Sequence, residues 1–210
     1  MKTFLIGGAR SGKSSLAARW AGERSARVCC IVTATVSDDE MSARIDAHRR
    51  ERPPHWRVRE EPLRLHTALQ EEGRSGDLLL VDCLTLWTAN CLWPPTPGPV
   101  QAPTPVRAPT PVQAPTSVQA PTPVQAPAPS TPDFQPDLPG WHAQRDAFLA
   151  TLRTAPGEIL IVSNEVGTSL VPENPAARLF RDEQGRLNQL VAAACDAVFL
   201  VTAGLALRLK

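Results

Sequence analysis

The sequence predicts an α/β fold, with a mostly parallel sheet covered by helices on both faces. Three observations support this prediction. Continuous apolar runs alternate with segments of helical periodicity, a glycine-rich loop joins the first run to the first helix, and proline is concentrated in one window. Of the 22 prolines, 16 lie between Pro94 and Pro139, and the rest of the 210-residue chain is long enough to form one domain.

Strands are expected where aliphatic residues run without interruption, and helices where apolar residues recur every three to four positions. The predicted strands cover residues 3–6, 28–33, 78–81, 159–162 and 198–201. The predicted helices cover residues 13–22, 38–50, a short stretch ending at about 92, 141–152 and 179–195. Strands that are apolar throughout are typical of a parallel sheet whose two faces are both buried.

The proline-rich window, residues 94–139, contains five copies of a six-residue repeat. The copies are PVQAPT, PVRAPT, PVQAPT, SVQAPT and PVQAPA, over residues 99–128. Proline lacks an amide N–H and fixes φ, which disfavours helix and sheet and leaves polyproline II or coil. We interpret the window as a solvated spacer inserted into a single catalytic domain made of residues 1–93 and 140–210. The alternative is a docking site for a proline-binding module.

The composition excludes several classes of function. The chain has 22 Lys and Arg residues and 21 Asp and Glu residues, so its net charge is +1. A chain this close to neutral has no overall positive potential that would attract nucleic acid or an anionic membrane. Because no apolar run reaches 18 residues, we expect no membrane span, and we also expect no signal peptide. The five cysteines lack a C-x-x-C spacing, so we expect buried thiols in a reducing cytoplasm.

Residues 7–14 fit the pattern G-x-x-x-x-G-K-[ST] and lie between a predicted strand and a predicted helix. Glycines let consecutive backbone N–H groups turn toward a phosphate, and the helix N-terminus adds partial positive charge. Lys13 would reach the β- and γ-phosphates, and Ser14 would ligate Mg²⁺. The pattern predicts a P-loop that binds a nucleoside triphosphate through Gly7, Gly8, Ala9, Arg10, Ser11, Gly12, Lys13 and Ser14.

A second magnesium ligand is expected at the end of another strand. Asp82 directly follows the aliphatic run 78–81, as the Walker-B acid does in P-loop enzymes. The alternative role of Asp82 is to cap the helix that follows, and the two roles are compatible.

The segment 38–53 places one histidine next to three arginines. From the residues alone, His48 shares a helix face with Met41 and Ile45 and is interpreted as a packed or surface histidine. Arg49, Arg50 and Arg52 then form a solvated face. Beside a P-loop, the same arginines could instead grip a nucleoside triphosphate.

Taken together, these motifs resemble the bifunctional adenosylcobinamide kinase / adenosylcobinamide-phosphate guanylyltransferase family of cobalamin synthesis. The resemblance covers residues 1–93 and about 140–210. It rests on GGARSGKS (7–14), DDEM-x-x-RI-x-x-H (38–48), RP-x-HW (52–56), DCLTLW-x-x-N (82–90), NEVG-x-x-x-VPEN (164–174) and R-x-FRD-x-x-G-x-x-NQ (178–189). The proline-rich window, which follows Asn90, is the main departure, because relatives cross that region with a short connection.

The resemblance implies a RecA-like P-loop NTPase fold and two reactions. The first phosphorylates the aminopropanol hydroxyl of adenosylcobinamide with ATP or GTP. The second transfers GMP from GTP to that phosphate and releases pyrophosphate. The resemblance also implies a homotrimer and a covalent guanylyl intermediate on the histidine that matches His48, which overrides the structural interpretation of this residue.

The family's nucleotide contacts beyond the P-loop match a further set of positions. They are Val32, Thr33, Ala34, Arg49, Arg50, Glu51, Arg52, Glu60 and Asp82. A neutral His48 imidazole would attack the α-phosphorus, and the adjacent arginines would disfavour its protonation. Two alternatives remain: a P-loop enzyme with only one of the two activities, and a nucleotide-dependent binding module that recruits a partner through the proline-rich window.

Overall fold

The computed structural model describes residues 1–35, 52–94 and 135–210. Met1–Pro94 and Gln135–Lys210 form one compact unit. The predicted helix at 38–50 and most of the proline-rich window lie outside the described residues.

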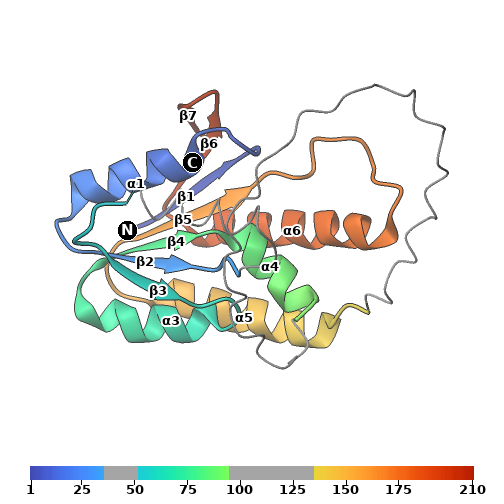
Figure 1. Cartoon of the computed structure of the whole chain (residues 1–210), viewed down its shortest axis with the longest axis horizontal. Coiled ribbons are helices and arrows are strands. Elements are labelled where there is room, and N and C mark those ends of the chain that lie inside the picture. Colours follow the sequence, from blue (N-terminus) through green and yellow to red (C-terminus); the bar gives the residue numbers. More distant parts are fainter. Residues whose placement is uncertain (36–51, 95–134) are drawn as a thin grey trace, which may run out of the picture. The chain divides into compact units, whose positions relative to one another are not determined.

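The unit is built on one seven-stranded sheet with the order β3-β2-β4-β5-β1-β6-β7 (Figure 1). All neighbouring strands run parallel except β7, which is antiparallel to β6. The strands are β1 (Lys2–Gly7), β2 (Val28–Val32), β3 (Arg57–Glu60), β4 (Leu78–Asp82), β5 (Ile159–Asn164), β6 (Ala197–Thr202) and β7 (Leu205–Arg208). The parallel sheet confirms the predicted fold class, and the five predicted strands are β1, β2, β4, β5 and β6.

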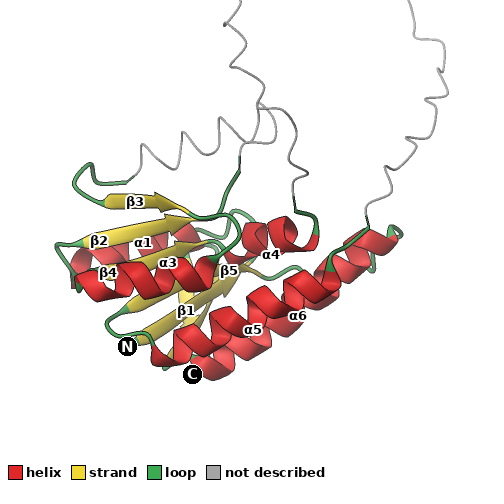
Figure 2. Ribbon diagram, turned by 90° about the horizontal axis from the view of Figure 1, so that it is seen from below, coloured by secondary structure: helices red, strands yellow, loops and turns green. Residues whose placement is uncertain are grey.

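Helices cover both faces of the sheet, as predicted. They are α1 (Lys13–Arg24), α3 (Leu65–Glu72), α4 (Leu84–Leu92), α5 (Leu138–Thr154) and α6 (Pro175–Ala194), with a 3₁₀ turn η1 (Gly73–Ser75). Figure 2 shows α3, α5 and α6 on the near face and α1 on the far face. Strand β1 contributes to both layers, because Phe4 and Ile6 pack toward α3–α6 while Leu5 packs toward α1.

The larger core, under α3–α6, is centred on aromatic residues. Trp87 packs edge-on against Trp141 with ring centroids 5.3 Å apart, and Phe148 lies 5.0 Å from Trp87. Both buried indoles donate hydrogen bonds: Trp87 Nε1 to the Leu63 carbonyl at 2.8 Å, and Trp141 Nε1 to Glu183 Oε2 at 2.8 Å. Fixed aromatic rings therefore hold α4, α5 and α6 together.

The sequence prediction omitted β3, α3 and β7. Strand β3 reads Arg-Val-Arg-Glu and is largely exposed at one edge of the sheet, so it needs no apolar run. Salt bridges hold it in place: Arg57 Nη2 lies 2.9 Å from Asp77 Oδ2, and Arg59 Nη1 lies 2.6 Å from Glu71 Oε2. Strand β7, at the other edge, is exposed along its whole length.

The two ends of the proline-rich window meet in the structure. Helix α4 ends at Leu92, whose carbonyl accepts a hydrogen bond from the Asp137 N–H at 2.8 Å. Asp137 also caps α5, since its Oδ1 accepts from the Gly140 N–H at 2.9 Å. The described residues on either side of the window therefore meet between the end of α4 and the start of α5.

All five cysteines are free thiols, and four of them are buried: Cys29, Cys30, Cys91 and Cys195. Burial raises the pKa of Cys29 to about 11 and that of Cys30 to about 12. The burial of these four free thiols confirms the prediction of buried thiols. None of the helices in the described ranges is both long and apolar enough to cross a bilayer.

Candidate nucleotide site

The glycine-rich loop curls between β1 and α1, where the sequence predicted a P-loop. Arg10 and Gly12 both have positive φ, 57° and 88°, which bends the backbone inward. A Cβ atom on Gly7 would lie 2.3 Å from the Val201 carbonyl oxygen, so only glycine fits there. The loop thus takes its shape from backbone constraints rather than from side-chain packing.

The turn between β6 and β7 supports the loop from outside. The Gly204 N–H donates to the Ser11 carbonyl at 2.9 Å, and a Cβ on Gly12 would lie 3.2 Å from the Gly204 Cα. Ala203 and Gly204 both have positive φ, which lets the turn approach so closely. This support was not foreseen, because β7 itself was not predicted.

Lys13, the first residue of α1, points back over the loop. Its Nζ donates to the Gly8 carbonyl at 3.1 Å, and the residue is only 8% exposed. Burial lowers the pKa of Lys13, while the nearby Cys83 and Asp82 act in the opposite direction. A partly desolvated ammonium group beside inward-turned amides is well suited to bind phosphate.

Asp82 ends β4 and faces the start of α1. Ser14 Oγ donates to Asp82 Oδ1 at 3.2 Å, and Arg52 Nη2 lies 3.5 Å from Asp82 Oδ2. The hydroxyl and the carboxylate that the sequence paired as magnesium ligands are therefore adjacent in space. Hard oxygen donors of this kind suit Mg²⁺.

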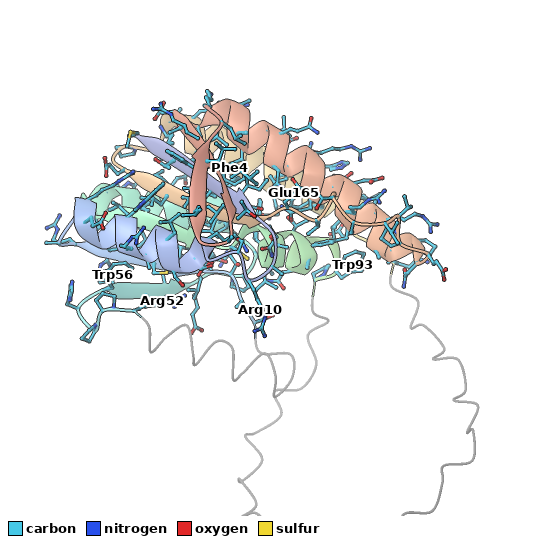
Figure 3. The ribbon with its side chains drawn as sticks, turned by 90° about the horizontal axis from the view of Figure 1, so that it is seen from above. Phe4, Arg10, Arg52, Trp56, Trp93 and Glu165 are labelled. Carbon is cyan, nitrogen blue, oxygen red and sulfur yellow. The ribbon has the colours of Figure 1, made fainter. Side chains whose placement is uncertain are left out.

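A hollow of about 400 Å³ opens beside these residues, along α1. It is lined by Ser14, Ser15, Ala18, Arg19, Gly22, Arg52, Pro53, Trp56, Leu80 and Asp82. Trp56 is 7% exposed, and its Nε1 is buried without a hydrogen-bond partner. Figure 3 shows Arg52 and Trp56 on the same side of α1. The volume is in the range of small-molecule sites.

A second hollow of about 420 Å³ continues from the first along β3. It shares Arg52, Pro53 and Trp56 with the first hollow and adds Pro54, Val58 and Glu60. Glu60 ends β3 in register with Val32 of β2. Between them, the two hollows are lined by the Ser14–Asp82 pair and by Glu60.

Comparison with known proteins identifies the family that shares these features. The family model described as cobinamide kinase / cobinamide phosphate guanyltransferase matches residues 3–209. The chain belongs to this family.

Curated relatives of the cobinamide kinase family match the chain along its full length. The bifunctional adenosylcobalamin biosynthesis protein CobP of Pseudomonas aeruginosa is 37% identical over 210 residues, covering 100% of this chain and 98% of the relative. The bifunctional adenosylcobalamin biosynthesis protein CobU of Escherichia coli is 32% identical over 210 residues, and that of Salmonella typhimurium is 32% identical over 214. Both matches cover 100% of this chain and 100% of the CobU protein.

Val32, Thr33 and Ala34 match nucleotide contacts of the family. In this structure, Thr33 forms hydrogen bonds to the end of β4. Thr33 is fully buried, and its Oγ1 donates to the Cys83 carbonyl at 2.6 Å and accepts from the Cys83 N–H at 3.1 Å. The Thr33 N–H donates to the Asp82 carbonyl at 3.2 Å. These bonds fix the Asp82–Cys83 peptide, which is cis. Val32 and Ala34 flank Thr33 at this edge of the sheet.

Four residues matched to the cobinamide kinase family lie outside the described residues: His48, Arg49, Arg50 and Glu51. The structure therefore brings together the P-loop, Arg52 and Asp82. Glu60 lines the second hollow and ends β3 at the same edge of the sheet as Asp82, since both residues are in register with Val32.

Trp56 lines both hollows, and the sequence analysis did not include it among the candidate site residues. A signal was present, because Trp56 closes the RP-x-HW segment that begins at Arg52.

Proposed function

We propose that this member of the family catalyses both reactions that the family description names. It would phosphorylate the aminopropanol hydroxyl of adenosylcobinamide with ATP or GTP, and then transfer GMP from GTP to the resulting phosphate. The observation that carries this proposal is the meeting of Lys13, Ser14, Asp82 and Arg52 beside a hollow of nucleotide size. A phosphate-binding loop alone would support only nucleotide binding.

In this proposal, Gly7–Ser14 hold the triphosphate. Backbone amides and the start of α1 would bind phosphate oxygens, and Lys13 would exchange its bond to the Gly8 carbonyl for bonds to the β- and γ-phosphates. Arg52 is already aimed at Asp82 and would offset phosphate charge. The nucleoside would lie along the hollows toward Trp56 and Glu60.

Ser14 and Asp82 fit a magnesium ion, since their oxygen atoms lie 3.2 Å apart at the loop. Mg²⁺ bound there would neutralise charge on the phosphates during transfer. Asp82 would supply a carboxylate ligand and Ser14 a hydroxyl ligand, while phosphate oxygens complete the shell.

The kinase step is a displacement at the γ-phosphorus. The acceptor hydroxyl oxygen forms a bond to this phosphorus as the bond to the β,γ-bridging oxygen breaks, and the electron pair leaves with ADP or GDP. The hydroxyl proton passes to the solvent. Lys13 holds the leaving phosphate and the transferred group in line, which is the positioning that such reactions require.

The guanylyl step would use His48 as its nucleophile. A neutral imidazole nitrogen bonds to the α-phosphorus of GTP as pyrophosphate leaves, and the phosphate of adenosylcobinamide phosphate then displaces histidine. Arg49, Arg50, Glu51 and Arg52 follow in the chain and would contact the same nucleotide, together with Val32, Thr33, Ala34 and Glu60. This assignment is supported by the family and by the position of Arg52 at Asp82.

We further propose that the enzyme works as a cytoplasmic homotrimer with no nucleic-acid partner. The near-neutral net charge of the chain supports the absence of a nucleic-acid partner, because the chain has no overall positive potential that would attract phosphate backbones. The trimer is supported by resemblance to the family, in which subunit contacts lie beside the active sites.

One experiment tests both activities together. The full-length protein is incubated with adenosylcobinamide, Mg²⁺ and GTP, and the corrinoid products are analysed by mass. We expect adenosylcobinamide phosphate first and adenosylcobinamide-GDP later. A product that stops at the phosphate would show a kinase alone, and an unchanged corrinoid would contradict the proposed function.

A further inference from the structure

The first hollow follows α1 from Ser14 to the indole of Trp56. Most of the wall that α1 contributes consists of small residues, Ser14, Ser15, Ala18 and Gly22. Eight helical steps separate Ser14 from Gly22, so this wall is about 12 Å long. A Cβ atom on Gly22 would lie 3.6 Å from Trp56 Cζ2, which places the indole against α1 at Gly22. The hollow therefore begins at a proposed magnesium ligand and reaches an aromatic edge.

Backbone and packing contacts fix the position of this indole. The Trp56 N–H donates to the Pro53 carbonyl at 3.1 Å, and the next residue, Arg57, begins β3 in register with Cys29. The ring packs in the core on the α1 side of the sheet, and Trp56 is 7% exposed. A side chain held in this way presents its polar edge with little freedom, as a preorganised binding group must.

The Nε1–H group of Trp56 has no hydrogen-bond partner among the described residues. Buried polar atoms are nearly always paired, as the indoles of Trp87 and Trp141 are here. Nε1 and Cζ2 are bonded to the same ring carbon, so the N–H lies on the edge of the indole that is nearest Gly22. An indole N–H can only donate. The missing partner is therefore an acceptor atom, and a molecule bound in the hollow can supply it.

The lining of the hollow suits a flat and largely apolar group such as a purine base. Ala18, Gly22 and Leu80 present carbon atoms, and the polar residues Ser14 and Asp82 lie where the phosphates are proposed to bind. The two purines differ at the edge that such a donor would meet. Guanine has two acceptors there, O6 and N7, whereas adenine has the acceptor N7 beside a donor amino group.

We propose that Trp56 selects guanine over adenine by donating from Nε1 to O6 of the base. This inference rests on the proposed function, in which the nucleoside lies along the hollows. An adenine in the same position would turn its amino group toward the indole N–H, so that two donors would face each other without an acceptor. Trp56 is thus a specificity-determining residue. It acts on the base, and it takes no part in the bonds made and broken at phosphorus.

The proposed hydrogen bond makes the effect of Trp56 depend on a single atom of the ligand. Trp56→Phe keeps an aromatic ring and removes the N–H group. The nucleotide of 2-aminopurine keeps the amino group of guanine and lacks O6. We expect Trp56→Phe to weaken binding of the guanine nucleotide about tenfold, and binding of the 2-aminopurine and adenine nucleotides less than about threefold. The difference between these losses isolates the bond from Nε1 to O6.

The test uses the full-length protein and measures binding and turnover. Calorimetry with GDP, ADP and 2-aminopurine riboside diphosphate, each with Mg²⁺, gives the three affinities without chemical reaction. Guanylyl transfer is then measured with GTP and preformed adenosylcobinamide phosphate, and phosphorylation with ATP and adenosylcobinamide. In Trp56→Phe, KM for GTP should rise about tenfold with kcat within about twofold of wild type, because the bond is made in the ground state and the transition state alike. KM for ATP should change less than about threefold.

Trp93→Phe is the matched control. Trp93 Nε1 is also buried and unpaired, but Trp93 is not among the residues that line the two hollows. This variant should leave the relative affinities of the three diphosphates unchanged. Equal losses for all three diphosphates in Trp56→Phe would show that Trp56 only packs, and no loss would show that it has no role in binding. Either result would overturn the inference.

The wild-type protein provides a second measurement that does not depend on folding of the variant. Equal affinities for GDP and the 2-aminopurine diphosphate would overturn the inference even if Trp56→Phe does not fold. Failure of the inference and failure of the proposed function are distinguishable. A wild-type protein that forms adenosylcobinamide-GDP but fails these comparisons would overturn the inference alone. A wild-type protein that binds no GDP and converts no corrinoid would overturn the proposed function and the inference with it.

Discussion

Lys13 is the residue on which both proposed reactions depend most directly. It is 8% exposed, and its Nζ lies 3.1 Å from the Gly8 carbonyl, at the mouth of the loop. Because one triphosphate cradle serves both reactions, Lys13→Ala should lower kcat/KM of each by about 100-fold or more. Steady-state assays of the two half-reactions measure this. Lys2→Ala is the control, since Lys2 lies at the other end of β1 and should leave both rates unchanged. Full guanylyl transfer by Lys13→Ala would show that the cradle is not shared.

His48 allows the two reactions to be separated. Covalent catalysis predicts that GTP labelled at the α-phosphate leaves a label on the denatured wild-type protein, stable in base and labile in acid. His48→Ala should lose both this label and guanylyl transfer, and should keep phosphorylation. His55→Ala, at an exposed histidine, is the control and should be labelled normally. A label that persists in His48→Ala would assign the nucleophile to another residue.

Among the secondary-structure elements, α6 is anchored by a buried carboxylate. Glu183 is 3% exposed and accepts from Trp141 Nε1 at 2.8 Å. Burial alone would raise the pKa of Glu183, but hydrogen bonds from Trp141 and Arg186 and the charges of Arg186 and His142 hold it below its usual value. A lowered pKa in the folded state means that this stabilisation is complete above the unfolded-state pKa. It is lost as the pH falls through the folded-state pKa.

We therefore expect Glu183→Gln to reduce the free energy of unfolding by about 1 kcal/mol at pH 7. The difference from wild type should shrink as the pH falls below about 4, because the wild-type carboxylate becomes protonated. Urea unfolding at several pH values measures this. Asp182→Asn is the control, since Asp182 is half exposed and its ion pair with Arg181 should contribute little. A difference that grows toward acid pH would contradict this interpretation.

Four of the five strands that the sequence predicted are buried on both faces of the sheet. Strands β1, β2, β4 and β5 are almost wholly buried, so their composition is continuously aliphatic and easy to recognise. The elements it missed depend on tertiary contacts. Strand β3 is held by ion pairs of Arg57 and Arg59 with carboxylates of α3 and Asp77, and a charged tetrapeptide carries no strand signal.

The same distinction applies to the site. Gly7–Ser14 and Asp82 were predictable because a local pattern encodes their geometry. The support that Gly204 gives to Ser11 links residues far apart in the chain, and no local pattern reports it. The hollow lined by Trp56 likewise depends on how residues 52–56 pack against α1, which is a property of the fold.

For the molecule as a whole, the proline-rich window should be dispensable. Leu92 and Asp137 are hydrogen-bonded to each other, so a linker of about four residues can replace residues 95–134. If the window is the solvated spacer that its sequence predicts, both activities should stay within about twofold. The free energy of unfolding should rise by about 1.5 kcal/mol, because the loop between Leu92 and Asp137 becomes roughly five to six times shorter and is easier to close. Activity assays and urea unfolding of the shortened protein test this. Loss of either activity, or lower stability, would assign the window a role in the enzyme.

The order of strands in the sheet also has a consequence for synthesis of the chain. Strand β1 is the first to be made, yet its partners β5 and β6 begin at Ile159 and Ala197. At typical translation rates, roughly 10 to 30 s pass between β1 and β5. During that interval an aliphatic segment emerges without the strands that will cover its edges, which is a period of exposure to aggregation or chaperone binding. The nascent chain can complete its phosphate-binding loop only after the β6–β7 turn, which supports Ser11, has left the ribosome.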